Sequence, residues 1–167
     1  REGTAAGVPV RVMRISFSGE LAYEINVCAN EARHVWEALL VAGAKYGITP
    51  YGTETMHVLR AEKGFVIVGQ DTDGSVTPVD LGMDWIVAKG KDFLGRRSLA
   101  RADTARPDRK HLVGLLTDDP KEVLPEGAQV VADAKLPPPV PMLGHVTSSY
   151  HSACVGRSIA LAMIAAS

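Results

Sequence analysis

The sequence predicts an α+β fold in two parts. Residues 1–103 combine strictly alternating apolar positions with apolar stripes at spacings of three and four, which are the periods of strands and helices. Residues 110–167 instead hold short apolar runs separated by prolines and turn residues, a pattern typical of a small barrel or sandwich. Residues 104–109 show no apolar periodicity and contain Pro107, so we expect a linker there.

The composition excludes several classes of protein. The chain has 167 residues, of which 46% are hydrophobic, and this share is too high for a disordered chain. A net charge of −1 gives no field that would attract phosphate backbones or anionic lipid, and the longest uncharged stretch is too short to span a bilayer. We therefore expect no nucleic-acid partner and no membrane.

The two cysteines and the start of the chain indicate a compartment. Cys28 and Cys154 lie far apart and lack the spacing of a zinc site or a redox pair. No charged segment followed by an apolar one opens the sequence, so we expect no signal peptide. The expected location is the cytoplasm.

The first predicted elements form a hairpin. Residues 3–7 are rich in glycine and alanine and are expected to be a flexible lead-in. A strand over 10–17 is followed by the turn residues Ser18 and Gly19 and then by a strand over 21–27, in which apolar residues alternate with others. Glu24 is the single carboxylate on the face opposite the apolar one.

Two amphipathic helices are expected next. Asn30 can cap the first, which ends near Gly43 or Gly47. Its apolar stripe consists of Ala32, Val35, Trp36, Leu39 and Leu40. The second helix runs from Thr53, as cap, to Lys63, with Gly64 in the left-handed position after its end.

Shorter elements complete the predicted order. Residues 65–68 are all apolar and predict a buried strand, followed by a polar loop over 69–78. An apolar segment around Trp85 and a short helical turn over 95–101 end the first part. Beyond the linker, strands are expected over 112–116, 129–131, 140–147 and 158–164.

Most residues that could carry chemistry have a simpler interpretation. The sequence has no glycine-rich nucleotide loop. Residues 71–74 lack the later ligands of a calcium loop and are expected to be a plain turn. His145, His151 and Cys154 meet no known ligand spacing, so no metal site is expected, and His57 is expected to have a helical surface or packing role.

Glu24 leaves two interpretations open. Its carboxylate is either a solvated residue of the outer face or an acceptor pair aimed into a cavity. An ionised carboxylate offers two acceptor oxygens in one plane, which complements a ligand that presents two parallel N–H donors. Pterins and guanidines are ligands of this kind.

Five motifs, in order and spacing, resemble the later part of the aminomethyltransferase (glycine-cleavage T-protein) family. They are Arg14-Ile-Ser-Phe-Ser-Gly-Glu-Leu-Ala-Tyr-Glu-Ile25, Val35-Trp-Glu-Ala-Leu39, Leu59-Arg-Ala-Glu-Lys-Gly64, Gly69-Gln-Asp-Thr-Asp73 with Thr77-Pro78, and Gly144-His-Val-Thr-Ser148 with Ile159-Ala-Leu-Ala-Met163. Within that family, residues 50–64 are most similar to the C-terminal folate-binding region of the alpha subunits of heterotetrameric sarcosine oxidases.

The resemblance implies a tetrahydrofolate site. It implies that Glu24 hydrogen-bonds the pterin ring, that Phe17 lies against the folate where the family has Tyr, and that Tyr23 and Trp85 line the site. Aminomethyltransferases carry Arg-Asp where this chain has Met56-His57, and the missing Arg contacts folate in those enzymes. No catalytic residue is expected here, because the family's catalytic Asp belongs to the preceding half of the folate domain.

The resemblance also implies a larger enzyme. Residues 1–103 would be the later part of a folate-binding domain and residues 110–167 an incomplete aminomethyltransferase-type β-barrel, left unclosed at the end of the chain. The parent enzyme would demethylate sarcosine oxidatively to glycine, H2O2 and 5,10-methylenetetrahydrofolate, with FAD, FMN and NAD bound elsewhere. Its partners would be the preceding part of the alpha subunit and the beta, gamma and delta subunits.

Two alternatives remain. The first is a T-protein-like aminomethyltransferase or a folate-dependent demethylase, and the second is a non-catalytic subunit-docking module. The 167 residues alone are expected to be inactive and to self-associate through apolar surface that packs against missing parts.

Overall fold

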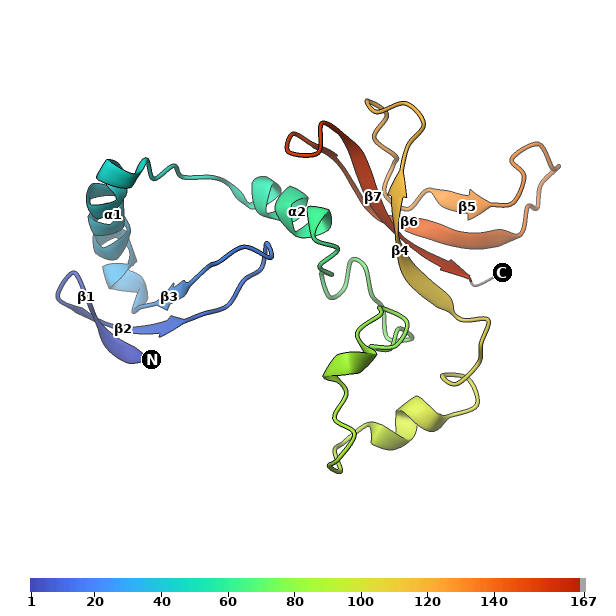
Figure 1. Ribbon diagram of the computed structural model, residues 1–167, viewed down its shortest axis with the longest axis horizontal. Helices are drawn as coiled ribbons and strands as arrows, with labels where there is room; N and C mark the ends of the chain where they lie inside the picture. The colour runs from blue at the N-terminus through green and yellow to red at the C-terminus, as the bar shows by residue number, and fades with distance from the viewer. Residues whose placement is uncertain (166–167) are drawn as a thin grey trace. The chain divides into compact units, whose positions relative to one another are not determined.

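The computed structural model describes residues 1–165, which form two compact units, one of Arg1–Lys63 and one that begins at Gly64 (Figure 1). Helices and a small sheet make up the first unit, and the second combines short helical turns with a larger sheet. This is the α+β composition that the sequence predicts.

The first unit contains a three-stranded antiparallel sheet of order β1-β2-β3. Its strands are β1 (Glu2–Ala5), β2 (Val8–Met13) and β3 (Glu24–Asn26). The prediction of a flexible lead-in is wrong, because β1 pairs along its whole length with β2. Ala6 and Gly7 turn the chain between them with φ of 51° and 78°, as two-residue hairpin turns require.

The predicted pairing of the next two strands is confirmed, but both are shorter than expected. In β2 and β3, Val12 pairs with Ile25 and Met13 with Glu24, and residues 14–23 form a loop. The alternation that predicted a strand from Leu21 onward has no core to pack on, since Leu21 is 71% and Tyr23 60% exposed. We call residues 14–23 the β2–β3 loop.

Both predicted helices are present. The first is α1 (Ala32–Gly43), flanked by the short turns η1 (Ala29–Glu31) and η2 (Ala44–Tyr46), and the second is α2 (Thr53–Glu62). The predicted caps are wrong, because Glu31 and Gly52 occupy the cap positions and neither makes a side-chain capping bond. Gly64 follows α2 with a φ of 70°, as expected.

Residues 65–68 do not form the predicted buried strand. Val68 is 86% and Phe65 46% exposed, and Val68 makes only an isolated bridge to Thr72. Gly64 and Gly69 flank this segment with positive φ, so an apolar run of four residues is enclosed by turns and finds no neighbouring strand. Two short helical turns follow, η3 (Asp84–Ile86) and η4 (Arg96–Ala100), the second where a turn was predicted.

All four strands predicted beyond residue 110 are confirmed and form an antiparallel sheet of order β4-β7-β6-β5 (Figure 1). They are β4 (Lys110–Leu116), β5 (Gln129–Val131), β6 (Met142–Ser152) and β7 (Arg157–Ala165). β7 pairs with both β4 and β6, so the last strand lies inside the sheet and the open edges belong to β4 and β5. Buried residues of β6 and β7 form the core, including Val146, Tyr150 and Ala162.

No helix within residues 1–165 combines the length and the apolar character that crossing a membrane would need.

Gly144 of β6 lies against the backbone of β7, where a side chain has no room. A Cβ atom there would lie 2.0 Å from the carbonyl oxygen of Met163 and 2.8 Å from Cα of Ile164. Gly144→Ala is therefore expected to force β6 and β7 apart at a cost of about 1–3 kcal/mol. The measurement is amide hydrogen exchange of β6 and β7, which should become faster. Gly114→Ala in β4 is the control, because a Cβ there meets nothing within 4 Å, and equal exchange in both variants would contradict the prediction.

Candidate functional site

Three of the four predicted folate-binding residues lie in one segment of the first unit. Phe17 and Tyr23 belong to the β2–β3 loop, where they are 40% and 60% exposed, and Glu24 opens strand β3. Pairing of Glu24 with Met13 fixes the backbone of Glu24 in the sheet. The structure thus presents two aromatic rings and one carboxylate along a single stretch of chain.

The carboxylate of Glu24 is available for a ligand. Glu24 is exposed on the edge strand of the sheet. Within residues 1–165 its side chain takes part in no hydrogen bond or ion pair, in contrast to Glu2 in the same sheet, which binds Arg11 at 3.1 Å. Both oxygens of Glu24 can therefore accept hydrogen bonds from two parallel N–H groups.

The β2–β3 loop lies against α2. The ring centroids of Phe17 and His57 are 6.2 Å apart, and Lys63 Nζ lies 3.2 Å from Glu20 Oε1. His57 is partly exposed on α2 and contacts Phe17, which is compatible with the surface or packing role predicted for it. The aromatic and acidic side chains of the segment are thus displayed on a loop with defined contacts.

Trp85, the fourth predicted residue, belongs to the second unit. It lies in η3 and is 75% exposed, so it is not a core residue of that unit. Its role as a folate-site residue stays a prediction.

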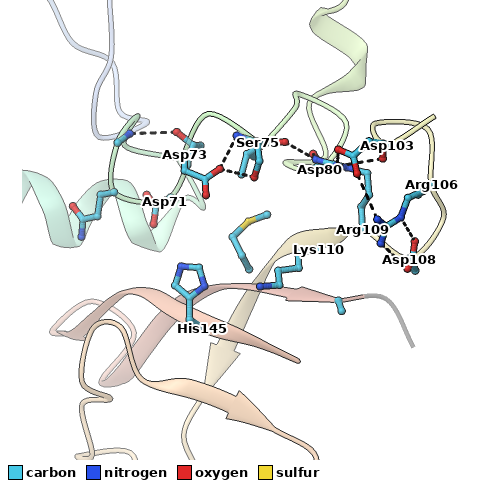
Figure 2. Close-up of a pocket in the computed structure, with 16 residues that line it drawn as sticks. Asp71, Asp73, Ser75, Asp80, Asp103, Arg106, Asp108, Arg109, Lys110 and His145 are labelled. Atoms are coloured by element: carbon cyan, nitrogen blue, oxygen red, sulfur yellow. Dashed lines mark hydrogen bonds and ion pairs between the residues drawn. The ribbon is translucent and has the colours of Figure 1, made fainter. Parts of the chain in front are cut away.

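A polar pocket of about 400 Å³ lies in the second unit (Figure 2). Figure 2 shows Asp71, Asp73 and Ser75 on one side, with Lys110 and His145 on the sheet opposite. Arg106, Arg109, Asp80, Asp103 and Asp108 complete its charged lining.

Asp71 is the most deeply buried acid of this pocket and was missed by sequence reasoning. It is 1% exposed, and its Oδ1 accepts hydrogen bonds from Thr147 Oγ1 at 2.6 Å and Ser148 Oγ at 2.7 Å. Its Oδ2 accepts the backbone N–H of Ile67 at 2.8 Å. In the segment 71–74, where only a plain turn was expected, Asp71 therefore links the loop after α2 to strand β6 through buried hydrogen bonds. Its partners lie 76 and 77 positions along the chain, so no local pattern could have revealed it.

Asp80 and Arg109 form a second buried link. Arg109 donates from Nε to Asp80 Oδ1 at 2.9 Å and from Nη2 to Asp80 Oδ2 at 2.7 Å. Burial alone would raise the pKa of Asp80, but hydrogen bonds from Arg109 and Thr77 outweigh it and lower the pKa to about 2. Arg109 lies in the predicted linker, and this pair ties that segment to the loop before η3.

The Asp80–Arg109 pair predicts a pH dependence of stability. The pKa of Asp80 falls from its ordinary value near 4 in the unfolded chain to about 2 in the folded one. The contribution of Asp80 to the stability of the fold is therefore complete above pH 4 and disappears as the pH falls towards 2. This difference in pKa corresponds to about 2 kcal/mol in the free energy of unfolding. The measurement is the protection of the Leu112 amide, which donates to the carbonyl of Asp80 at 2.8 Å. Protection should fall over this range in the wild type, and an equal fall in Asp80→Asn would contradict the assignment.

Most charged side chains of the pocket form ion pairs with each other. Asp80, Asp103 and Asp108 are each paired with Arg106 or Arg109. Within residues 1–165, no three His, Cys, Asp or Glu side chains are grouped as metal ligands would be, and His151 and Cys154 are exposed. The unpaired carboxylate of Glu24, which lies on the same stretch of chain as Phe17 and Tyr23, is therefore the better candidate for ligand binding.

Comparison with known families covers most of the chain. Residues 1–91 match the GCVT N-terminal domain, and residues 110–167 match the glycine cleavage T-protein C-terminal barrel domain.

Curated relatives carry two names. The chain is 57% identical over 161 residues to sarcosine oxidase subunit alpha of Corynebacterium sp. (strain P-1), which covers 95% of this chain and 17% of that protein. It is 44% identical to the subunit alpha of Rhizobium meliloti (strain 1021), covering 92% of this chain and 16% of that protein. Aminomethyltransferase of Thermotoga petrophila is 33% identical over all of this chain and 43% of its own length. The chain thus spans about a sixth of the alpha subunits that it matches.

A solved structure supports the fold. The aminomethyltransferase T of the glycine cleavage system from Bartonella henselae matches with a TM-score of 0.77 at 23% identity, over 92% of this chain and 41% of that one. With a family match that covers more than half of the chain and an agreeing fold, the chain belongs to the glycine cleavage T-protein family, joining part of a GCVT N-terminal domain to the family's C-terminal barrel domain.

Proposed function

We propose that this chain is a tetrahydrofolate-binding portion of a sarcosine oxidase alpha subunit. The observation that carries the proposal is the unpaired, exposed carboxylate of Glu24 at the end of a loop that also presents Phe17 and Tyr23. The identity of 57% to a sarcosine oxidase subunit alpha, against 33% to an aminomethyltransferase, favours the oxidase branch.

The residues of the segment divide the binding of the pterin between them. Glu24 accepts two N–H donors of the ring through its two oxygens, which fixes the orientation of the ring in its plane. Phe17 packs against the face of the ring, and Tyr23 lines the site. A role for Trp85, which belongs to the second unit, follows from the family resemblance alone. Phe17 stands where the family has Tyr, so the stacking surface is kept while a hydroxyl contact is lost.

The whole enzyme would couple an oxidation to the capture of one carbon. A flavin outside this chain would take two electrons from the N-methyl group of sarcosine and pass them to O2, which becomes H2O2. The freed carbon, at the oxidation level of formaldehyde, would be transferred to tetrahydrofolate as 5,10-methylenetetrahydrofolate and leave glycine. This chain would hold the folate acceptor through Glu24, and the catalytic Asp that the resemblance implies would lie outside it.

The organisation of the parent protein belongs to the same proposal. Residues 1–103 are assigned to the folate-binding domain, 104–109 to a linker and 110–167 to the barrel domain. The remaining part of the alpha subunit and the beta, gamma and delta subunits would supply FAD, FMN and NAD. Cys28 and Cys154 are both free and exposed, which supports a reducing compartment, the cytoplasm.

Met56-His57 favours oxidation over transfer of an aminomethyl group, because aminomethyltransferases carry Arg-Asp there. A T-protein-like aminomethyltransferase or a folate-dependent demethylase is nevertheless the second candidate, since the chain is 33% identical to an aminomethyltransferase. A docking module without folate is the third.

The experiment is performed on the full-length protein purified from its source. Sarcosine, O2 and tetrahydrofolate should together give glycine, H2O2 and 5,10-methylenetetrahydrofolate, and the complex should show flavin absorbance and an alpha subunit several times longer than this chain. A protein without flavin that still transfers one-carbon units would support the transferase instead. Retained subunit assembly without any folate binding would support the docking module.

A further inference from the structure

We propose that the β2–β3 loop is positioned for the folate by His57 of α2 and by Lys63, the residue that follows α2. The inference rests on the proposed function, because it concerns how the β2–β3 loop is held for tetrahydrofolate. Neither residue is placed against the ligand itself; both act through loop residues that they contact.

The loop needs such support because the sheet holds only Glu24 among the proposed ligand residues of this segment. Pairing with Met13 fixes Glu24 at the start of β3. Phe17 lies within the ten residues between β2 and β3, where no strand pairing exists. A mobile Phe17 would have to be ordered when the ligand binds, and that ordering weakens affinity.

Lys63 anchors the middle of the loop. A Cβ atom on Gly19 would lie 2.5 Å from Cγ and 3.0 Å from Cβ of Lys63, so the loop backbone rests directly on the stem of this side chain. The φ of Gly19 is 82°, a conformation that glycine adopts without strain. The ammonium group of Lys63 then reaches Glu20 at 3.2 Å.

His57 supports Phe17. Their ring centroids are 6.2 Å apart with an angle of 40° between the rings, which is within the range of favourable aromatic contacts. Glu54, one turn earlier on α2, lies 3.8 Å from Nδ1 of His57. Phe17 remains 40% exposed, so part of the ring is free for a ligand while His57 packs against it. Position 57 therefore contributes to the folate site through the ring of Phe17.

The first test compares His57→Ala with His57→Phe in the full-length enzyme. His57→Ala should raise the KM and the dissociation constant for tetrahydrofolate about three- to tenfold, a loss typical of one aromatic contact, while the KM for sarcosine stays unchanged. His57→Phe should restore the affinity, because it keeps a ring against Phe17. His34→Ala on α1 is the control, since His34 contacts the carbonyl of Ala6 and not the loop.

The second test reverses the Glu20–Lys63 pair. Glu20→Lys should weaken tetrahydrofolate binding about two- to fivefold, as expected for an exposed ion pair, and Lys63→Glu added to it should restore binding. A double variant no better than the single one, or His57 variants that bind as tightly as the wild type, would overturn the inference while Glu24 still mattered for binding. A wild type that binds no tetrahydrofolate would overturn the proposed function and, with it, this inference.

Discussion

Replacing Glu24 by alanine is expected to raise the dissociation constant of the full-length protein for tetrahydrofolate roughly 30- to 1000-fold. The variant removes two charged hydrogen bonds to the pterin, which together are worth about 2–4 kcal/mol. The structure supports a direct effect, because the side chain of Glu24 has no partner within the described chain and its removal breaks no contact there. Isothermal titration of the wild type and the variant gives the measurement.

Two further variants test whether the loss of affinity is specific to the carboxylate of Glu24. Glu24→Gln keeps the size of the side chain but replaces one acceptor oxygen with a donor, so it should lose most of the affinity too. Glu2→Ala removes an exposed carboxylate from β1 of the same sheet and should leave binding unchanged. Wild-type affinity in both Glu24 variants would show that this carboxylate does not hold the pterin.

Replacing Asp71 by alanine is expected to destabilise the second unit by roughly 3–5 kcal/mol. The carboxylate accepts hydrogen bonds from Thr147, Ser148 and the Ile67 amide, and bonds to a charged group contribute about 1.5–3 kcal/mol each. Asp71 is 1% exposed and Ser148 is fully buried, so water cannot readily replace the carboxylate. The loop after α2 would thereby lose its link to β6.

Hydrogen exchange measures this effect locally in the full-length protein. The equilibrium constant for opening of β6 and β7 should increase by more than about 100-fold in Asp71→Ala. Asp73→Ala is a matched control two residues away, because the carboxylate of Asp73 accepts hydrogen bonds from the nearby Ser75 rather than from a distant strand, and Asp73 is exposed. Equal protection of β6 in both variants would contradict the structural role assigned to Asp71.

The sequence predicted those helices and strands whose apolar residues recur with the regular period of the element and are also packed in the fold. Helix α1 and strands β4 to β7 follow from their apolar patterns, and Gly64 ends α2 as its conformational freedom requires. Strand β1 was missed because Gly3 and Ala5 have little strand preference, so its formation depends on pairing with β2. The strand predicted over residues 65–68 is absent, because these apolar residues have no neighbouring strand to pair with.

The candidate site likewise contains residues that the sequence predicts and contacts that it does not. The alternation around Glu24 and the family motifs point to Phe17, Tyr23 and Glu24, which lie in one segment of the chain, and their role in folate binding stays a prediction. The contacts of the loop with His57 and Lys63 could not be read from the sequence, because they depend on how the loop folds back onto α2. The same holds for Asp80 and Arg109, which meet across 29 residues.

A crystal structure of the full-length protein with tetrahydrofolate bound would test the folate site directly. We expect two pterin N–H groups within hydrogen-bond distance of the two carboxylate oxygens of Glu24, with the ring of Phe17 against the pterin. Density for the pterin at a site that contacts neither Glu24 nor Phe17 would show that these residues do not form the folate site.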